Sequence, residues 1–313
     1  MIYLVDASYY VFRAWFALPD TLRDDRGRPV NAVHGFARFL GDLLEKVDPE
    51  RIGVAFDESL TACFRNDWYP PYKANRELPP AELEHQFARC RELTRAFGVA
   101  DLASARYEAD DIIGTIAVRA QARGVPVTIM SRDKDLAQLL RPGDQLHDPA
   151  TGKRVRYEDV RDFLGVRAEQ VADFLALTGD AVDNIPGVPG IGPKTAAGLL
   201  AAFDSVDDLL AGLDGVRALA LRGAARVAAA LDLHREQLAL NRRLTTIACD
   251  APVTTGLACL CRSAPCREHL DDLHNRLRFG PALRAQAQRI ASRHGAAGVS
   301  MELFPRPAAS HAR

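Results

Sequence analysis

Three short apolar runs set the pattern of the N-terminal half of the chain. Residues 2–5, 52–56 and 125–131 are largely apolar, and aspartate follows each run at once or within two residues. Runs of this length are typical of strands buried on both faces of a parallel sheet. Apolar positions recur at helical spacing in the intervals, for example over residues 33–47. Strands alternating with helices predict an α/β fold with a mostly parallel, doubly wound sheet.

Three acidic residues crowd the start of a predicted helix. Glu108, Asp110 and Asp111 precede apolar positions at helical spacing, and Gly124 is a suitable helix end. Carboxylates this close either take up a proton or need a cation between them, and a hard divalent cation with oxygen ligands meets that need. The alternative is an ordinary acid-rich helix N-terminus, which the helix dipole stabilises. Spacing alone leaves both interpretations open.

Acidic residues also follow the predicted strands. Asp6 follows the first strand, Asp57 the second, and Asp133 and Asp135 the third. Ligands of open parallel sheets bind outside the carboxyl ends of the strands, which meet at one edge. The strand-end acids therefore converge with those at the helix start, and this convergence favours a cation site at that edge.

The segment of residues 63–106 interleaves aromatic and basic side chains. Arg65, Tyr72, Lys73 and Arg76 lie in its most mixed part, and four prolines between positions 70 and 80 indicate irregular backbone. Aromatic rings stack on bases while Lys and Arg bind phosphates, so the segment is a candidate nucleic-acid contact. The alternative is a surface loop that packs its own aromatic residues.

A glycine-rich stretch at residues 177–196 carries two more acids and a hairpin. Asp180 and Asp183 would share one face of a helix end. A P-loop is excluded, because proline stands before the lysine and no strand precedes the stretch. Two helices joined by a hairpin fit better, with backbone N–H groups free to bind a phosphate; the alternative is an ordinary connection between helices. The hairpin residues are Gly190, Gly192, Lys194 and Thr195.

Overall composition adds little to the predicted fold and site, but the charge of the C-terminal part of the chain is informative. The 313 residues are 48% hydrophobic with a net charge of −1, which identifies no partner. Residues 217–313 hold fifteen Arg and no Lys against seven Asp and Glu, which suits a polyanion or a solvated helical surface. No apolar run is long enough to span a bilayer and no signal peptide is evident, so we expect a cytoplasmic protein with reduced thiols. Cys259, Cys261 and Cys266 lack a fourth zinc ligand at usual spacing, so we interpret them as incidental.

Together these motifs resemble those of the bacterial 5′ nucleases, which include the 5′–3′ exonuclease domain of DNA polymerase I and the flap endonucleases. The matching stretches occur in family order across roughly residues 1–290. They are residues 4–6, 54–57, 72–76, 107–111, 133–136 and 179–195. The resemblance implies a PIN-like (Rossmann-like) α/β domain at 1–168 with a helical arch at about 63–106. It also implies a helical DNA-binding domain at 169–292 with a helix-hairpin-helix-type motif, and a flexible tail at 293–313.

The resemblance further implies a 5′–3′ exonuclease and structure-specific 5′-flap endonuclease that hydrolyses DNA with two Mg²⁺ ions, which Mn²⁺ can replace. K⁺ at the hairpin is implied as well. The first implied metal cluster consists of Asp6, Asp57, Glu108, Asp110 and Asp111. The second consists of Asp133, Asp135, Asp180 and Asp183. Lys73 and Arg76 would assist catalysis from the arch.

DNA with 5′ ends, flaps or nicks is the implied substrate, with RNA primer strands as a further one. The implied contacts are Arg13, Arg65, Tyr72, Lys73, Arg76, Gly190, Gly192, Lys194 and Thr195. We expect a monomer in the cytoplasm with the nucleoid. Residues Ser300 to Phe304 are similar to peptides that bind the sliding clamp. Two alternatives remain open: a PIN-like RNase and a non-catalytic structure-specific DNA-binding protein.

Overall fold

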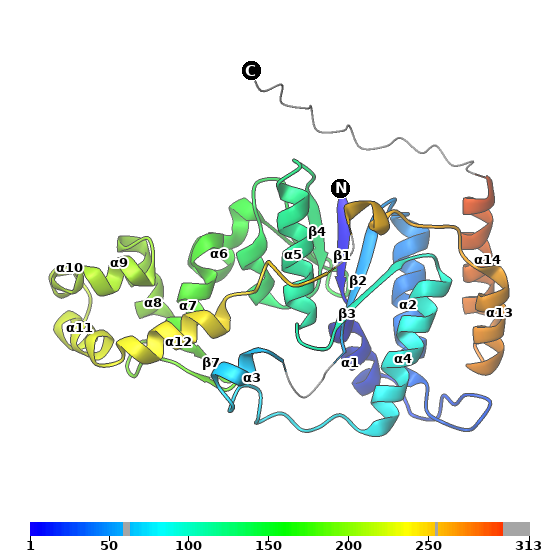
Figure 1. The fold of residues 1–313 in the computed structure, drawn as a ribbon, viewed down its shortest axis with the longest axis horizontal. Coiled ribbons are helices and arrows are strands. Elements are labelled where there is room, and N and C mark those ends of the chain that lie inside the picture. Colours follow the sequence, from blue (N-terminus) through cyan, green and yellow to red (C-terminus); the bar gives the residue numbers. More distant parts are fainter. Residues whose placement is uncertain (59–62, 254–255, 297–313) are drawn as a thin grey trace, which may run out of the picture.

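The computed structural model describes residues 1–58, 63–253 and 256–296 of the chain. Its central sheet consists of β1 (Ile2–Asp6), β2 (Ile52–Asp57), β3 (Ala100–Ser104), β4 (Val127–Met130), β5 (Gln145–Asp148) and β6 (Lys153–Arg156). Their order is β3-β2-β1-β4-β5-β6 (Figure 1). All neighbours are parallel except β5 and β6. The predicted mostly parallel sheet is therefore confirmed.

The three strands predicted from apolar runs lie side by side at the centre of this sheet. Leu4 of β1 packs into the core on one face of the sheet and Val5 into the core on the other. Both faces of the strand are therefore buried, which explains its continuous apolar run. Strands β3 and β5 were not predicted, because their mixture of buried and partly exposed positions gives no continuous apolar run. Asp6 and Asp57 are the last residues of β1 and β2, so the strand geometry delivers both to one edge.

Helices cover both faces of the sheet. Those in the N-terminal half are α1 (Ala7–Ala17), α2 (Asn31–Lys46), α3 (Arg65–Trp68), α4 (Ala81–Ala96) and α5 (Ala109–Gln121). The apolar sides of α1, α2 and α4 share one core with Val5, whereas α5 packs with Leu4 on the opposite face. Short elements after β4 complete this part: η1 (Lys134–Leu139), η2 (Tyr157–Asp159), α6 (Val160–Leu164) and η3 (Ala168–Gln170).

A group of helices projects from one end of the sheet, at the left of Figure 1. These are α7 (Val171–Thr178), α8 (Pro193–Ala202), α9 (Val206–Ala211), α10 (Leu213–Ala218), α11 (Ala224–Leu233) and α12 (Arg235–Thr245). Helix α7 ends because Gly179 has a φ of 75°. The chain then forms an antiparallel pair, β7 (Gly179–Asp180) with β8 (Ile185–Pro186). Asp180 is therefore the last residue of β7 and Asp183 lies in the turn that follows it, so the two acids are not at a helix end.

The C-terminal part of the chain returns to the sheet domain. It contains η4 (Leu257–Leu260), α13 (Arg267–Arg276) and α14 (Pro281–Ala296). Leu270, Leu273 and Ile290 join the same core as α2 and α4, so α13 and α14 pack on the α/β domain. The last helices of the segment 169–292, which was predicted as a helical domain, thus bury their apolar sides against the sheet domain.

The predicted tail at 293–313 lies largely outside the described residues, and Ser300 to Phe304 lie there entirely. Within the described ranges, no helix has the length and apolar character needed to cross a membrane.

Candidate active site

The acids at the ends of β1 and β2 are held by short hydrogen bonds from neighbouring elements. Asp6 accepts hydrogen bonds from the Tyr9 N–H at 3.3 Å and from the Ser131 hydroxyl at 2.8 Å. Asp57 accepts from the Ser8 hydroxyl at 2.5 Å and from the Ala109 N–H, at the start of α5, at 2.8 Å. Serine and backbone donors leave these carboxylates without a paired cation, so their negative charge is concentrated at the sheet edge.

Mutual repulsion among buried carboxylates identifies a first cluster. Burial raises the pKa of Asp6 to about 7, with further contributions from Asp57 and Asp133. Burial also raises the pKa of Asp110 well above its usual range, and the charges of Asp133, Asp6 and Asp57 add to the shift. A divalent cation would relieve this repulsion and hold all four acids ionised.

A second group of acids meets around Asp135. Burial raises the pKa of Asp135 to about 8, followed by the charges of Asp133, Asp180 and Asp183. Its Oδ1 atom is buried without a hydrogen-bond partner. A cavity of about 30 Å³, lined by Asp135, Asp110, Asp180 and Asp183 among others, adjoins it. Hard oxygen donors, an unpartnered buried oxygen and space for a small ion together fit a divalent metal.

Basic and phenolic groups of the arch occupy part of this acidic surface. The Lys73 ammonium pairs with Glu108 and lies 3.7 Å from Asp183, while Arg76 pairs with Asp183 at 2.5 Å. Burial alone would raise the pKa of Glu108, but Lys73 and Arg65 outweigh it and hold that pKa below its usual value. Among the described residues, no three acidic, His or Cys groups are already arranged around one ion position. Two of the acids, Glu108 and Asp183, are instead paired with the arch cations Lys73 and Arg76.

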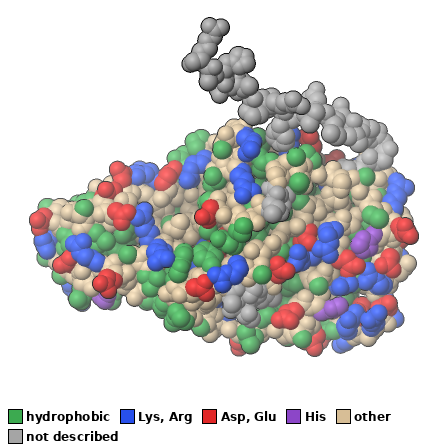
Figure 2. Space-filling view, viewed as in Figure 1, with side chains coloured by type: hydrophobic (Ala, Val, Ile, Leu, Met, Phe, Trp, Pro, Cys, Tyr) green, Lys and Arg blue, Asp and Glu red, His purple; other side chains and the backbone are tan. Residues whose placement is uncertain are grey.

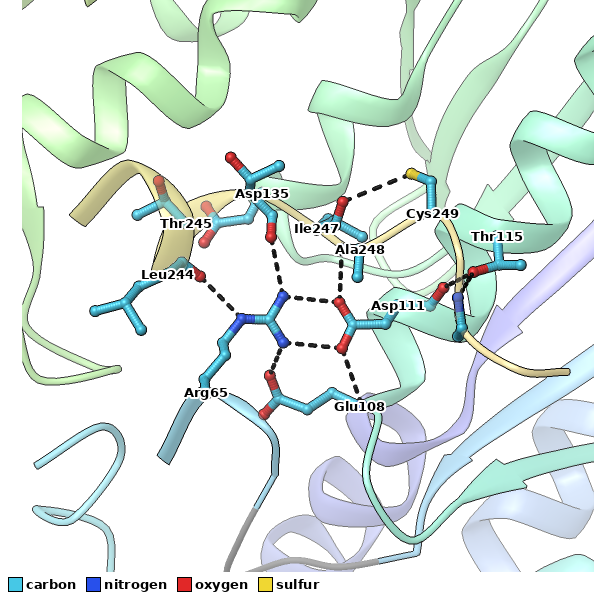
Figure 3. A network of polar contacts seen from close by, with 12 residues as sticks. Arg65, Glu108, Asp111, Thr115, Asp135, Leu244, Thr245, Ile247, Ala248 and Cys249 are labelled. Carbon is cyan, nitrogen blue, oxygen red and sulfur yellow. Dashed lines mark hydrogen bonds and ion pairs between the residues drawn. The ribbon is translucent and has the colours of Figure 1, made fainter. Parts of the chain in front are cut away.

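Asp111 differs from its neighbours because it faces an arginine (Figure 3). Both of its oxygens bind the Arg65 guanidinium, at 2.7 and 2.8 Å, and neither side chain is more than 3% exposed. The Ala248 and Glu108 N–H groups complete its contacts at 2.9 and 3.1 Å. Protein donors thus satisfy the Asp111 carboxylate in the described conformation, and its role as a metal ligand stays a prediction.

The same contacts correct the expected role of Arg65. Its Nε donates to the Leu244 carbonyl at 2.9 Å, and its two Nη groups bind Asp111, Glu108 and the Thr246 carbonyl. Every N–H group of this buried side chain is thus used within the protein, and none is left for DNA. Arg65 instead joins the arch to α5 and to the segment that leaves α12.

Tyr72 is also placed differently from the sequence expectation. Its side chain is 4% exposed, and its hydroxyl lies 2.9 Å from Glu108 and 3.0 Å from Asp183. A ring buried in this way has no free face on which a base can stack. In this conformation Tyr72 links two acids through its hydroxyl, and its expected contact with DNA stays a prediction.

The predicted hairpin lies on the surface beside the helical domain. Gly190 has a φ of 83°, and Gly192 is the N-cap of α8 with Pro193 in its first turn. A Cβ added at either glycine would meet nothing within 4 Å, so a ligand can approach this backbone closely. Lys194 is exposed and Thr195 half-buried. These features suit a phosphate contact, which stays a prediction.

Arg13 lies on the exposed side of α1, and no acidic side chain is paired with it among the described contacts. On the face shown in Figure 2, Lys and Arg side chains are interspersed with Asp and Glu. Basic side chains on this face therefore form no single continuous patch.

Two family profiles match consecutive parts of the chain. The profile of the 5′-3′ exonuclease N-terminal resolvase-like domain matches residues 1–165, and that of the 5′-3′ exonuclease C-terminal SAM fold matches residues 166–268. The chain belongs to the 5′-3′ exonuclease family. Both halves of the active-site edge, the strand-end acids and the turn between β7 and β8, fall within these matched regions.

Curated relatives of this 5′-3′ exonuclease chain are DNA polymerases I. The polymerase of Rhizobium leguminosarum is 42% identical over 266 residues, which are 83% of this chain and 26% of the relative. The thermostable polymerase of Thermus filiformis is 39% identical over 282 residues, which are 90% and 32% of the two chains. The chain thus spans between a quarter and a third of the length of these relatives.

Solved structures share the fold of this 5′-3′ exonuclease chain at low identity. A structure of T5 5′-exonuclease with bound zinc ions has a TM-score of 0.63 at 21% identity and covers 93% of this chain and 98% of its own. The catalytic core of Rad2 in complex with DNA substrate has a TM-score of 0.60 at 14% identity, with 92% and 90% covered. These matches establish the overall arrangement of sheet, arch and helical domain.

The sequence analysis did not identify some site residues of this family member. The Ser131 hydroxyl donates to Asp6 and accepts from the Asp133 N–H at 3.0 Å, so it spaces two acids. The Ser8 hydroxyl likewise donates to the carboxylate of Asp57, at 2.5 Å. Their partners lie 125 and 49 residues away, and no local signal in the sequence marks such pairs.

Proposed function

We propose that this protein is a metal-dependent 5′–3′ exonuclease and structure-specific 5′-flap endonuclease that hydrolyses DNA phosphodiesters. The observation that carries the proposal is the set of carboxylates that β1, α5, η1 and the β7–β8 turn bring together. Burial, and then the charges of neighbouring acids, raise the pKa values of Asp6, Asp110 and Asp135 in this set. Family membership supports the reaction class, and flap or primer removal in replication and repair would be its setting.

The residues that would hold divalent ions are Asp6, Asp57, Glu108, Asp110, Asp133, Asp135, Asp180 and Asp183. Two ions, Mg²⁺ or in its place Mn²⁺, supply Lewis-acid chemistry: activation of the attacking water and stabilisation of the leaving 3′ oxygen. No Ser, Cys or His nucleophile is then needed. The T5 5′-exonuclease structure with bound zinc ions and the Rad2 catalytic core in complex with DNA, which share this fold, support this assignment.

Lys73 and Arg76 would contribute positive charge at the scissile phosphate. In the described conformation they neutralise Glu108 and Asp183. With the carboxylates neutralised by bound cations, the Lys73 ammonium and the Arg76 guanidinium would be free to donate charge-assisted hydrogen bonds to phosphate oxygens. Arg76 is 47% exposed, so its exchange of partners needs no disruption of the core.

The hairpin and Arg13 would bind phosphates of the DNA at a distance from the scissile bond. Backbone N–H groups at the start of α8, with Lys194 beside them, suit a phosphate of the duplex, and K⁺ could be a further component there. Contacts of this kind recognise shape and phosphates with little reading of bases. The protein would act as a monomer, in the cytoplasm with the chromosome, and RNA primer strands would be further substrates.

Cleavage of a labelled 5′-flap DNA tests the proposed function. We expect a short 5′ product with Mg²⁺ or Mn²⁺, none with EDTA, and much slower cleavage of unstructured RNA. Preferential cleavage of the RNA would favour a PIN-like RNase. Tight flap binding with no product in either metal would favour a non-catalytic DNA-binding protein and would overturn the proposal.

We further propose that residues Ser300 to Phe304 bind a sliding clamp. The support is their sequence alone, in which Met301, Leu303 and Phe304 provide apolar anchors for a preformed pocket. Deleting residues 300–304 should abolish co-elution with the clamp while leaving flap cleavage unchanged in its absence. Unaltered clamp binding by the deletion variant would end this proposal.

A further inference from the structure

The arch and the β7–β8 turn are joined by contacts that do not involve the acidic side chains. Residues 71–76 and 180–184 meet in what we term the arch–turn contact. The Asn184 side-chain amide donates to the Pro71 carbonyl at 2.7 Å, and the Asn75 amide donates to the Ala181 carbonyl at 2.9 Å. Each segment thus provides one asparagine that binds the backbone of the other.

The backbone of the arch–turn contact holds an unusual conformation on both sides. Lys73 has a φ of 55° and Asn184 a φ of 58°, both in the left-handed region that costs energy for residues with a Cβ. Between them, the Lys73 N–H donates to the Asp183 carbonyl at 3.0 Å. Lys73 can keep this conformation because the contact fixes the backbone on either side of it.

This conformation determines where the arch cations lie. The Lys73 ammonium reaches Glu108 and the Arg76 guanidinium reaches Asp183 from the same short segment that the two asparagines hold. Those ion pairs form only while the carboxylates are ionised and bind no metal ion. The asparagine bonds are made to neutral carbonyls, so they persist when metal ions or phosphates take over the charged partners.

We infer that Asn75 and Asn184 are positioning residues, which hold Lys73 and Arg76 over the carboxylate cluster so that both cations face the scissile phosphate. This inference rests on the proposed nuclease function. The asparagines touch neither the acids nor the substrate position themselves. They act through the two cations, so their effect should vanish when the cations are absent.

A double-mutant cycle tests this dependence. The variant Asn75→Ala/Asn184→Gly removes both amides, and glycine at 184 keeps the left-handed backbone available. Single-turnover cleavage of flap DNA with excess enzyme should be roughly tenfold slower in this variant, because Lys73 and Arg76 are no longer held toward the scissile phosphate. In a Lys73→Ala/Arg76→Ala background, the same two substitutions should cost less than about twofold.

Three further measurements complete the test. Amide hydrogen exchange in residues 70–77 should be faster in the Asn75→Ala/Asn184→Gly variant without metal or DNA, and flap affinity and thermal midpoint should be unchanged. The matched control is Asn275→Ala on α13, which removes an amide that binds Arg284 at 2.7 Å and should leave cleavage unaltered. If the asparagine substitutions cost the same in both backgrounds, or leave exchange and rate unchanged, the inference is overturned. Failure of the wild-type protein to cleave any flap would instead overturn the proposed function.

Discussion

Replacing Asp110 with alanine should slow cleavage of 5′-flap DNA by roughly a thousandfold or more, because a carboxylate at the centre of the proposed metal cluster is lost. The charges of Asp133, Asp6 and Asp57 all raise the pKa of Asp110, which places it among them. Burial and repulsion make its ionised form costly in the metal-free fold. The variant should therefore be at least as stable as the wild type without metal.

Two measurements distinguish this result from damage to the fold. Flap binding by Asp110→Ala, followed by fluorescence anisotropy in EDTA, should match the wild type, and its urea midpoint in EDTA should be equal or higher. A variant that cleaves at more than about a tenth of the wild-type rate would remove Asp110 from the proposed ligand set.

Replacing the adjacent residue, Asp111, with alanine should mainly lower the stability of the fold, whereas the Asp110 substitution should mainly lower the cleavage rate. Its carboxylate is fully buried against the Arg65 guanidinium, and removal leaves that cation buried without its partner. Loss of one member of such a pair costs about 3–5 kcal/mol, which corresponds to a fall in thermal midpoint of roughly 10 °C. Urea unfolding at constant pH in EDTA provides the measurement.

Asp110→Ala is the matched control for Asp111→Ala, since both remove one carboxylate from the first turn of α5. At a temperature where both variants are folded, Asp111→Ala should retain more cleavage than Asp110→Ala. An Asp111→Ala protein with wild-type stability and no metal-dependent activity would support Asp111 as a ligand and contradict the role given to Arg65.

The contrast between these neighbours shows where sequence reasoning succeeded. The strand-end positions of Asp6 and Asp57 follow from the strand geometry, because parallel strands deliver their carboxyl ends to one edge. Asp110 and Asp111 are adjacent in a helix, so their side chains point about 100° apart. Their spacing could not show which one faces the sheet edge, because the partner of Asp111 is an arginine 46 residues earlier.

The arch and the helical domain were harder to predict for a similar reason. The sequence shows the mixture of aromatic and basic residues around Tyr72. It does not show that the ring is buried between acids from two distant segments. The turn that carries Asp180 and Asp183 resembled a helix end until the conformation of Gly179 was known. Helices α13 and α14 have helical patterns, yet only tertiary packing shows that their apolar sides join the sheet domain.

Crystals soaked in Mn²⁺ provide the most direct test of the claim that these carboxylates bind divalent ions. Anomalous difference maps should show manganese bound by oxygens of Asp6, Asp110 and Asp133 and by those of Asp135, Asp180 and Asp183, at roughly 2.0–2.3 Å. Lys73 and Arg76 should then have left Glu108 and Asp183. Maps without manganese at this edge, with both cations still paired to the acids, would contradict the account.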